Sequence, residues 1–207
     1  MAQKHRAIVR VVKDEAGQVL FAQVTTELFD GPTAVDERER LRFTSRFHPT
    51  VNEVFFAKRV VLLEEESAIV AFERSAELLG MFTRHPECRR DVTLIDTRGK
   101  GEIPLFQKVL NHFKIPYTVV HDEDAGHQNA AAENAAIMGL IAPGQAQNKV
   151  FMIRPTNLEG LLGYATGRNK PYMAVKRVEE LHSAGVFPAA FIQALNQVYF
   201  GQNHEPA

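Results

Sequence analysis

The sequence has a single cysteine, Cys88, and no tryptophan. One cysteine excludes an internal disulfide and a metal cluster built from several thiolates. An apolar run of about 18 residues, the length that suggests a membrane-spanning helix, does not occur. The N-terminus (MAQKHRAIVRVV) also lacks the basic, apolar and small-residue order of a signal peptide. These absences predict a cytoplasmic protein with no membrane partner.

Two further absences limit the functions that can be expected. The pattern G-x-x-x-x-G-K-[ST] does not occur, which excludes ATP binding through a phosphate-binding loop. Neither sign of charge dominates, because the sequence has 24 Lys and Arg and 25 Asp and Glu. The resulting net charge of −1 gives no general argument for nucleic-acid binding. Local basic clusters do occur, and each is either a solvated face or a rim for nucleic acid: Arg38, Arg40, Arg42 and Arg46; Lys58 and Arg59; Lys149, Arg154, Arg168, Lys170, Lys176 and Arg177.

The 207 residues are enough for one substantial α/β domain with an appendage. Alternating apolar and polar residues predict an N-terminal β-hairpin, with strands at 7–12 and 19–22 around a turn at 14–17. The polar stretch 30–46, with a short amphipathic helix at 35–41, is the candidate linker or lid.

From Lys58 onward, short apolar segments alternate with segments of helical spacing. Strands are predicted at 60–63, 92–95, 116–120 and 150–153, and helices at 67–79, 103–113, 130–141, 170–184 and 188–199. This alternation predicts a parallel sheet with helices on both faces, followed by C-terminal helices. We therefore divide the chain into a hairpin and connecting segment (1–57), a core (58–165) and a C-terminal helical segment (166–207).

Polar residues follow three of the predicted strands at the point where each strand ends. The segments are Glu64-Glu65-Glu66, Asp96 to Lys100, and His121 to Gly126. In an open parallel sheet, ligands bind beyond the carboxyl ends of the strands. The three segments are therefore expected to meet at one edge and to form a site there.

Asp122-x-Asp124 is the sharpest signal for a metal. Residues two apart on an extended segment point to the same side, so both carboxylates can face one hard cation. Glu64, which ends a neighbouring strand, would add a third carboxylate as a ligand or a base. The alternative is that the acidic pair only marks a loop, and that Glu65 and Glu66 favour the positive end of a helix dipole.

Gly99-Lys100-Gly101 precedes a predicted helix, so it suits either phosphate binding at a helix N-terminus or a plain strand-to-helix turn. The histidines are scattered without zinc-binding spacing and are interpreted as ordinary polar residues: His112, His121, His127 and His182.

The sequence also resembles a known family. V-V-L-L-E at 60–64, followed by a helix and a later strand ending in D-x-D, resembles the Toprim domain of topoisomerases, primases and some nucleases. The stretch VTLIDTRGKGEIPLFQKVLNHFKIPYTVVHDED (92–124) is similar to the overcoming-lysogenization-defect (OLD) family of nucleases. With the approach at 42–58, the resemblance covers about residues 42–180.

This resemblance implies a Toprim-type, Rossmann-like fold and a site for two Mg²⁺ or Mn²⁺ ions. The implied metal ligands are Glu64, Asp122, Asp124 and Glu159. Asn157 would be a further metal ligand or would contact one. Glu64 and Lys170 would be the catalytic residues. Two departures weaken one metal site, because the family has a glycine where this chain has Glu65 and a second acidic residue where it has Ala68. Glu65 or Glu66 would be the substitute ligand.

The function that the resemblance implies is a DNA endonuclease or nickase that hydrolyses phosphodiester bonds. Its family partners would be an N-terminal ATPase domain, absent from this chain, and a second copy in a homodimer. The main alternative is a degenerate Toprim module that binds nucleic acid or a partner protein without catalysis. A primase or topoisomerase Toprim domain and a response-regulator receiver with Asp96 as phosphoacceptor are further alternatives.

Overall fold

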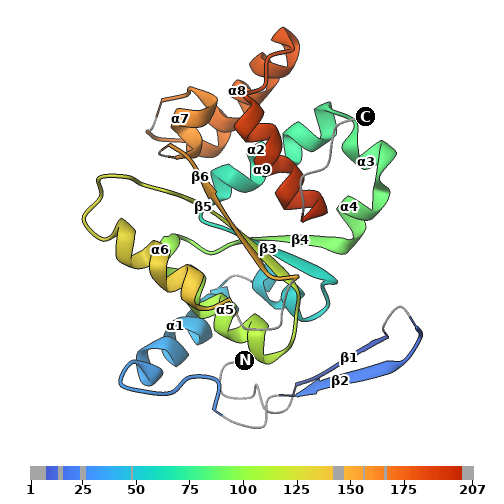
Figure 1. Cartoon of the computed structure of the whole chain (residues 1–207), viewed down its shortest axis with the longest axis vertical. Helices are drawn as coiled ribbons and strands as arrows, with labels where there is room; N and C mark the ends of the chain where they lie inside the picture. The colour runs from blue at the N-terminus through green and yellow to red at the C-terminus, as the bar shows by residue number, and fades with distance from the viewer. Residues whose placement is uncertain are drawn as a thin grey trace.

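The computed structural model describes residues 8–13, 16–23, 27–47, 49–141, 147–155, 157–165 and 167–201. Its centre is a four-stranded sheet of β3 (Arg59–Leu63), β4 (Val92–Asp96), β5 (Tyr117–Asp122) and β6 (Lys149–Ile153). All pairings are parallel, and the order is β4-β3-β5-β6 (Figure 1). The predicted α/β class with a parallel sheet is confirmed.

The sheet separates two hydrophobic cores, as the apolar sequence of β3 requires. Val60 and Leu62 belong to one core and Val61 and Leu63 to the other, and none of the four is exposed. Successive side chains of a strand point to opposite faces, so a strand covered on both sides is apolar at every position. Helices on both faces are thus confirmed.

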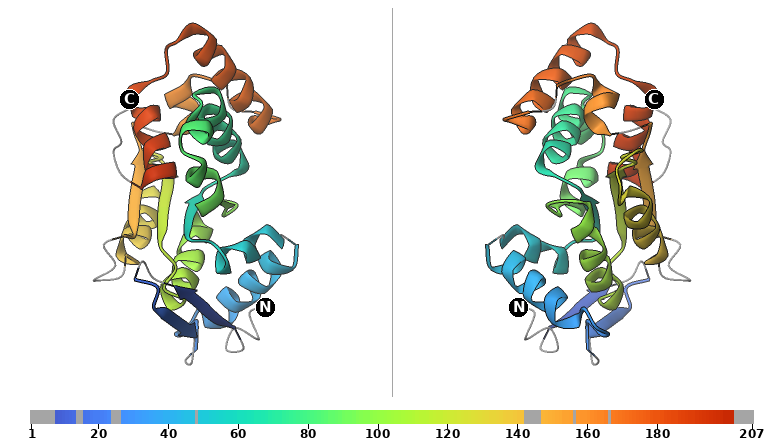
Figure 2. Two further views of the ribbon diagram at one scale, coloured as in Figure 1. Left: turned by 90° about the vertical axis from the view of Figure 1, so that its right-hand side faces the viewer. Right: turned by 90° about the vertical axis from the view of Figure 1, so that its left-hand side faces the viewer.

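Each core is closed by its own set of helices (Figures 1 and 2). The first contains residues of α1 (Ala34–Phe47), η2 (Pro49–Phe55), α5 (Ile103–His112) and α6 (Ala130–Gly139). The second contains residues of α2 (Glu66–Leu78), α3 (Met81–Arg84), α4 (Pro86–Asp91), α7 (Leu158–Leu162), α8 (Lys170–Ala184) and α9 (Ala189–Phe200).

The strand order determines where a site can form. The chain leaves β3 through α2 on one face and reaches β4 at the edge, and it then returns through α5 on the other face to β5. The connections therefore diverge between β3 and β5, which is the switch point where open α/β sheets bind ligands. Glu64 and Asp122 lie at the ends of these two strands.

The N-terminal hairpin is also confirmed, with β1 (Val9–Lys13) antiparallel to β2 (Val19–Gln23). It projects from the body of the molecule in Figure 1. The first residue of its predicted first strand, Ala7, and the turn residues Asp14 and Glu15 lie outside the described residues.

The candidate linker at 30–46 is mostly a packed helix. It is longer than predicted, because α1 continues to Phe47, and its Leu41 is buried in the first core. The Lys108 ammonium lies 2.6 Å from a Glu37 carboxylate oxygen, and Arg40 pairs with Glu102. These ion pairs attach α1 to α5 and to the short helix η3 (Lys100–Glu102).

The predicted C-terminal helices are present as α8 and α9. The side chain of Arg74 on α2 lies 2.7 Å from that of Glu179 on α8. The division at residues 165 and 166 stays a prediction. No helix within the described ranges is long and apolar enough to cross a membrane.

Candidate metal centre

The structure brings Glu64 and Asp122 together at the switch point. Leu63 is level with Val120 in the parallel pair, so the residues that follow them lie at the same edge. A Glu64 carboxylate oxygen accepts a hydrogen bond from the Asp122 backbone N–H at 3.3 Å. Of the three carboxylates predicted as the core of the site, Glu64, Asp122 and Asp124, the first two therefore sit at the ends of adjacent strands.

Asp122 is also joined to the helix that follows β6. Its Oδ1 accepts a hydrogen bond from the backbone N–H of Leu158 at 3.0 Å. Asn157 begins α7, and its side-chain oxygen accepts from the Gly160 N–H at 2.9 Å. Such a cap fixes the first turn of a helix. It also fixes the direction in which Glu159 leaves that turn.

Negative charge is crowded around Asp122. Burial is the largest cause that raises the pKa of its carboxyl to about 8, and the charges of nearby carboxylates add to it: Glu64, Asp124 and Glu159. Burial also raises the pKa of Glu64. A buried carboxyl among carboxylates favours either a proton or a bound cation. The local electrostatics thus favour positive charge at this point.

Two lysines supply positive charge to the cluster. The Lys100 ammonium lies 2.5 Å from a carboxylate oxygen of Asp124, and its side chain is only 4% exposed. The Lys170 ammonium lies 2.8 Å from a Glu159 oxygen and 3.2 Å from a Glu65 oxygen. The structure thus groups the predicted residues as Glu64 with Asp122, Lys100 with Asp124, and Lys170 with the remaining two acids.

The residues fit a hard divalent cation in chemistry, because all of the candidate ligands offer carboxylate oxygen. Their present arrangement is less complete. Within the described ranges, no three acidic, histidine or cysteine side chains are placed to share one ion. In this arrangement, Asp124 and Glu159 each face a lysine ammonium. Ala68 offers no ligand and is buried in the second core.

His121 is the site residue that sequence reasoning missed. It was interpreted as an ordinary polar residue, but it is 1% exposed beside Asp122. Its Nδ1 lies 2.9 Å from the Asp122 carbonyl oxygen, and burial is the main cause that lowers its pKa to about 4. It is therefore neutral at physiological pH. Its position at the end of an apolar run within β5 is the sequence signal that indicates burial.

Much of the local basic charge is used to hold the fold. The Arg59 guanidinium donates to the Val198 carbonyl at 2.8 Å, and Lys149 donates to the Gly201 carbonyl. Arg177 donates to the Leu162 carbonyl at 2.8 Å. Arg168, near Lys170, is exposed.

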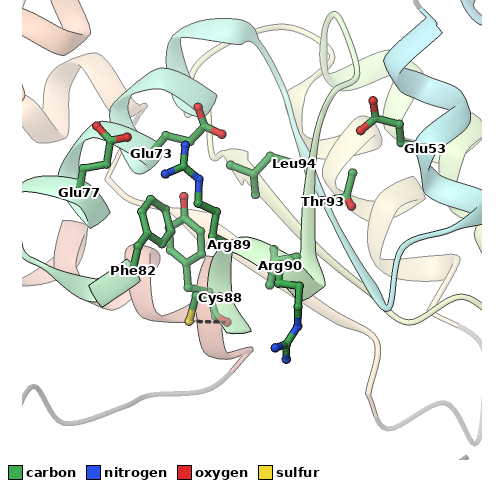
Figure 3. Close-up of a pocket in the computed structure, with 11 residues that line it drawn as sticks. Glu53, Glu73, Glu77, Phe82, Cys88, Arg89, Arg90, Thr93 and Leu94 are labelled. Atoms are coloured by element: carbon green, nitrogen blue, oxygen red, sulfur yellow. Dashed lines mark hydrogen bonds between the residues drawn. The ribbon is translucent and has the colours of Figure 1, made fainter. Parts of the chain in front are cut away.

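A separate pocket of about 360 Å³ lies beside β4, the strand at one edge of the sheet (Figure 3). Its lining mixes acidic, basic, aromatic and thiol side chains, including Glu73, Glu77, Phe82, Cys88 and Arg89. None of the predicted metal ligands is among its lining residues. The acidic cluster at the switch point is thus a different site.

A Toprim-type domain is expected to contain a parallel sheet with carboxylates at its switch point. In this chain, such carboxylates follow the strands on either side of that point. Residues 55–124 match the family described as overcoming lysogenization defect protein-like, TOPRIM domain. Over 94% of its length, the chain is 30% identical to the OLD nuclease of Thermus scotoductus. It spans 39% of the length of that relative.

Among solved structures, the chain is similar to the C-terminal region of the Burkholderia pseudomallei OLD protein. The identity is 14% and the TM-score 0.47, over 70% of this chain and 98% of that one. The family match and the Thermus relative confirm the resemblance predicted from the sequence. The similarity to an OLD-like TOPRIM domain covers residues 55–124.

Proposed function

We propose that this chain is a metal-dependent DNA endonuclease or nickase domain that hydrolyses phosphodiester bonds with two Mg²⁺ or Mn²⁺ ions. One observation carries the proposal: the partly buried Asp122 meets Glu64 at the switch point, where desolvation and then the nearby carboxylates raise its pKa to about 8. The OLD-like TOPRIM match and the Thermus OLD nuclease support the same reaction.

The proposed ligands would divide into two groups, with Asp122 contributing to both. Glu64 would help to hold one ion, and Asp124 and Glu159 would help to hold the other. Glu65 lies on the far side of Lys170 and is the nearest substitute for the acid missing at Ala68. Bound divalent ions supply an activated water and stabilise the leaving 3′-oxygen.

The chain's own residues hold and neutralise the substrate. Lys170 would donate to a phosphate oxygen and stabilise the negative charge of the transition state. Arg168, which is exposed near it, would bind the neighbouring backbone phosphate. Contacts with phosphates carry little sequence information, so cleavage should show weak sequence preference and strong salt dependence.

The test is cleavage of supercoiled plasmid by the purified chain in Mg²⁺, Mn²⁺ or EDTA. We expect nicking with metal, none in EDTA, and none by Asp122→Asn, whose amide keeps an acceptor for the Leu158 N–H. Asp36→Asn is the control, because that carboxylate is 71% exposed on α1. Undiminished cleavage by the Asp122 variant would overturn the assignment of the site.

Ala68 favours one alternative, a Toprim module that binds nucleic acid or a partner without cutting it. This residue is 7% exposed among apolar side chains, so no acid is offered from that position. DNA binding without cleavage in any metal would support this alternative. The receiver alternative loses support, because it needs a phosphoacceptor on a central strand and Asp96 ends the edge strand β4.

The proposed partners are DNA, an N-terminal ATPase domain in the full-length protein, and a second copy of the chain. The relative that is matched is longer than this chain, which spans 39% of it. Light scattering after size-exclusion chromatography measures the homodimer directly.

A further inference from the structure

Lys100 is buried far more than a lysine normally is. Its side chain is 4% exposed, and its ammonium lies 2.5 Å from the carboxylate of Asp124. Burying an ammonium costs free energy unless it is paired, so a lysine in such a place is held there by its partner. The sequence is compatible with phosphate binding or a plain turn at this residue, whereas in the structure its ammonium points into the acidic cluster.

The turn that carries Lys100 is firmly attached to β3. The backbone N–H and the hydroxyl of Thr97 both donate to the Leu63 carbonyl, each at 2.9 Å. The N–H of Gly99 donates to the Glu64 carbonyl at 2.7 Å. Arg98 has φ 64° and Gly99 has φ 117°, so the chain bends through two left-handed residues. These contacts fix Lys100 relative to the strand that carries Glu64.

The position of the ammonium has a consequence for metal binding. Asp124 is a proposed ligand, and the oxygen that faces Lys100 is not free for an ion while the pair is intact. A divalent cation beside Asp124 and an ammonium 2.5 Å from it would also repel each other. The ion and the lysine therefore cannot hold that carboxylate equally well at the same time.

We propose that Lys100 is a built-in cation that competes with one divalent ion for Asp124. This rests on the proposed metal site and adds a positioning residue to it. Lys100 neutralises the cluster when no metal is bound and acts through Asp124, so it tunes the affinity of the ion that Asp124 binds. The chain should accordingly bind one Mn²⁺ more tightly than a second.

The experiment measures Mn²⁺ binding to the full chain by calorimetry, together with melting curves in Mn²⁺ and in EDTA. In Lys100→Met the weaker Mn²⁺ site should tighten by at least about tenfold, because a competing charge has gone. The melting temperature in EDTA should fall, and the Mn²⁺-induced rise should be larger than in wild type. Lys108→Met is the control, since that lysine pairs with Glu37 on α1.

A second variant covers the case in which Lys100→Met does not fold. Lys100→Gln keeps an N–H donor for Asp124 without the charge, and it should show the same tightening. If the weaker site binds Mn²⁺ with unchanged or lower affinity in the folded variants, the competition is refuted.

The proposed metal site is tested separately by Asp122→Asn. Loss of Mn²⁺ binding in this variant, combined with no effect of Lys100, would overturn only the role of the lysine. Wild-type protein that binds no Mn²⁺ would overturn both.

Discussion

Replacing Lys170 by methionine should separate its structural role from its catalytic one. In wild type its ammonium lies 2.8 Å from Glu159, whose side chain is 4% exposed, and 3.2 Å from Glu65. Methionine keeps most of the length of the side chain and removes the charge. The buried carboxylate of Glu159 is then left without its cation, which is the costly half of a broken ion pair.

The size of the effect follows from burial. A hydrogen bond to a charged group contributes about 1.5–3 kcal/mol. The Lys170 side chain is 36% exposed, so solvent screens its half of the pair. We therefore expect a loss in unfolding free energy of about 1–2 kcal/mol in EDTA. For a protein of this size, that corresponds to a fall in melting temperature of about 2–8 °C.

Metal should restore the stability of this variant but not its activity. An ion bound by Glu159 replaces the missing charge, so the difference in urea unfolding between Lys170→Met and wild type should shrink in Mn²⁺. Plasmid cleavage should stay lost, because the group that neutralises the transition state is gone. Lys176→Met is the matched control, since that lysine is exposed on the same helix. Cleavage at the wild-type rate would refute the catalytic role, and unchanged stability in EDTA would refute the structural one.

Three further results are expected. Asn157→Ala removes the cap of α7 and should cost about 1 kcal/mol in urea unfolding. It should also reduce cleavage, because Glu159 loses its fixed direction. Asn157→Asp should keep both stability and cleavage close to wild type. Thr97→Val should cost about 1 kcal/mol in urea unfolding, because it removes the hydroxyl that donates to the Leu63 carbonyl, and a variant with wild-type stability would show that this bond is dispensable. Cys88 is 2% exposed, and burial is the main cause that raises its thiol pKa. It should therefore react with a thiol reagent only as fast as the protein unfolds, and rapid modification in native buffer would contradict its burial.

The features predictable from the sequence were those that depend on local pattern. An apolar run such as Val60–Leu63 must be covered on both sides, and an acid directly after it must lie at the edge of the sheet. The meeting of Glu64 and Asp122 also requires that β3 and β5 be neighbours, as they are in the order β4-β3-β5-β6. The hydrogen bond from the Asp122 N–H to the Glu64 carboxylate confirms that these two residues lie close together.

The features that the sequence did not reveal depend on distant partners. Nothing near Lys100 in the sequence shows that its ammonium reaches Asp124, because this requires the left-handed turn at Arg98 and Gly99. The attachment of α1 is similar, since its Glu37 pairs with Lys108 on the distant helix α5. The metal-ligand roles stay predictions. The structure adds that Asp124 and Glu159 are paired with lysines, which a bound ion would have to displace.

The hydrogen bond between the Leu158 N–H and the Asp122 carboxylate makes one amide a reporter of the whole site. This amide opens the first turn of α7, and its protection from exchange with solvent deuterium depends on what else Asp122 holds. A cation drawing on the same carboxylate would alter that protection, while amides in the middle of β3 would keep theirs. Occupancy of the acidic edge could thus be followed at a single backbone position, without substrate and without any turnover.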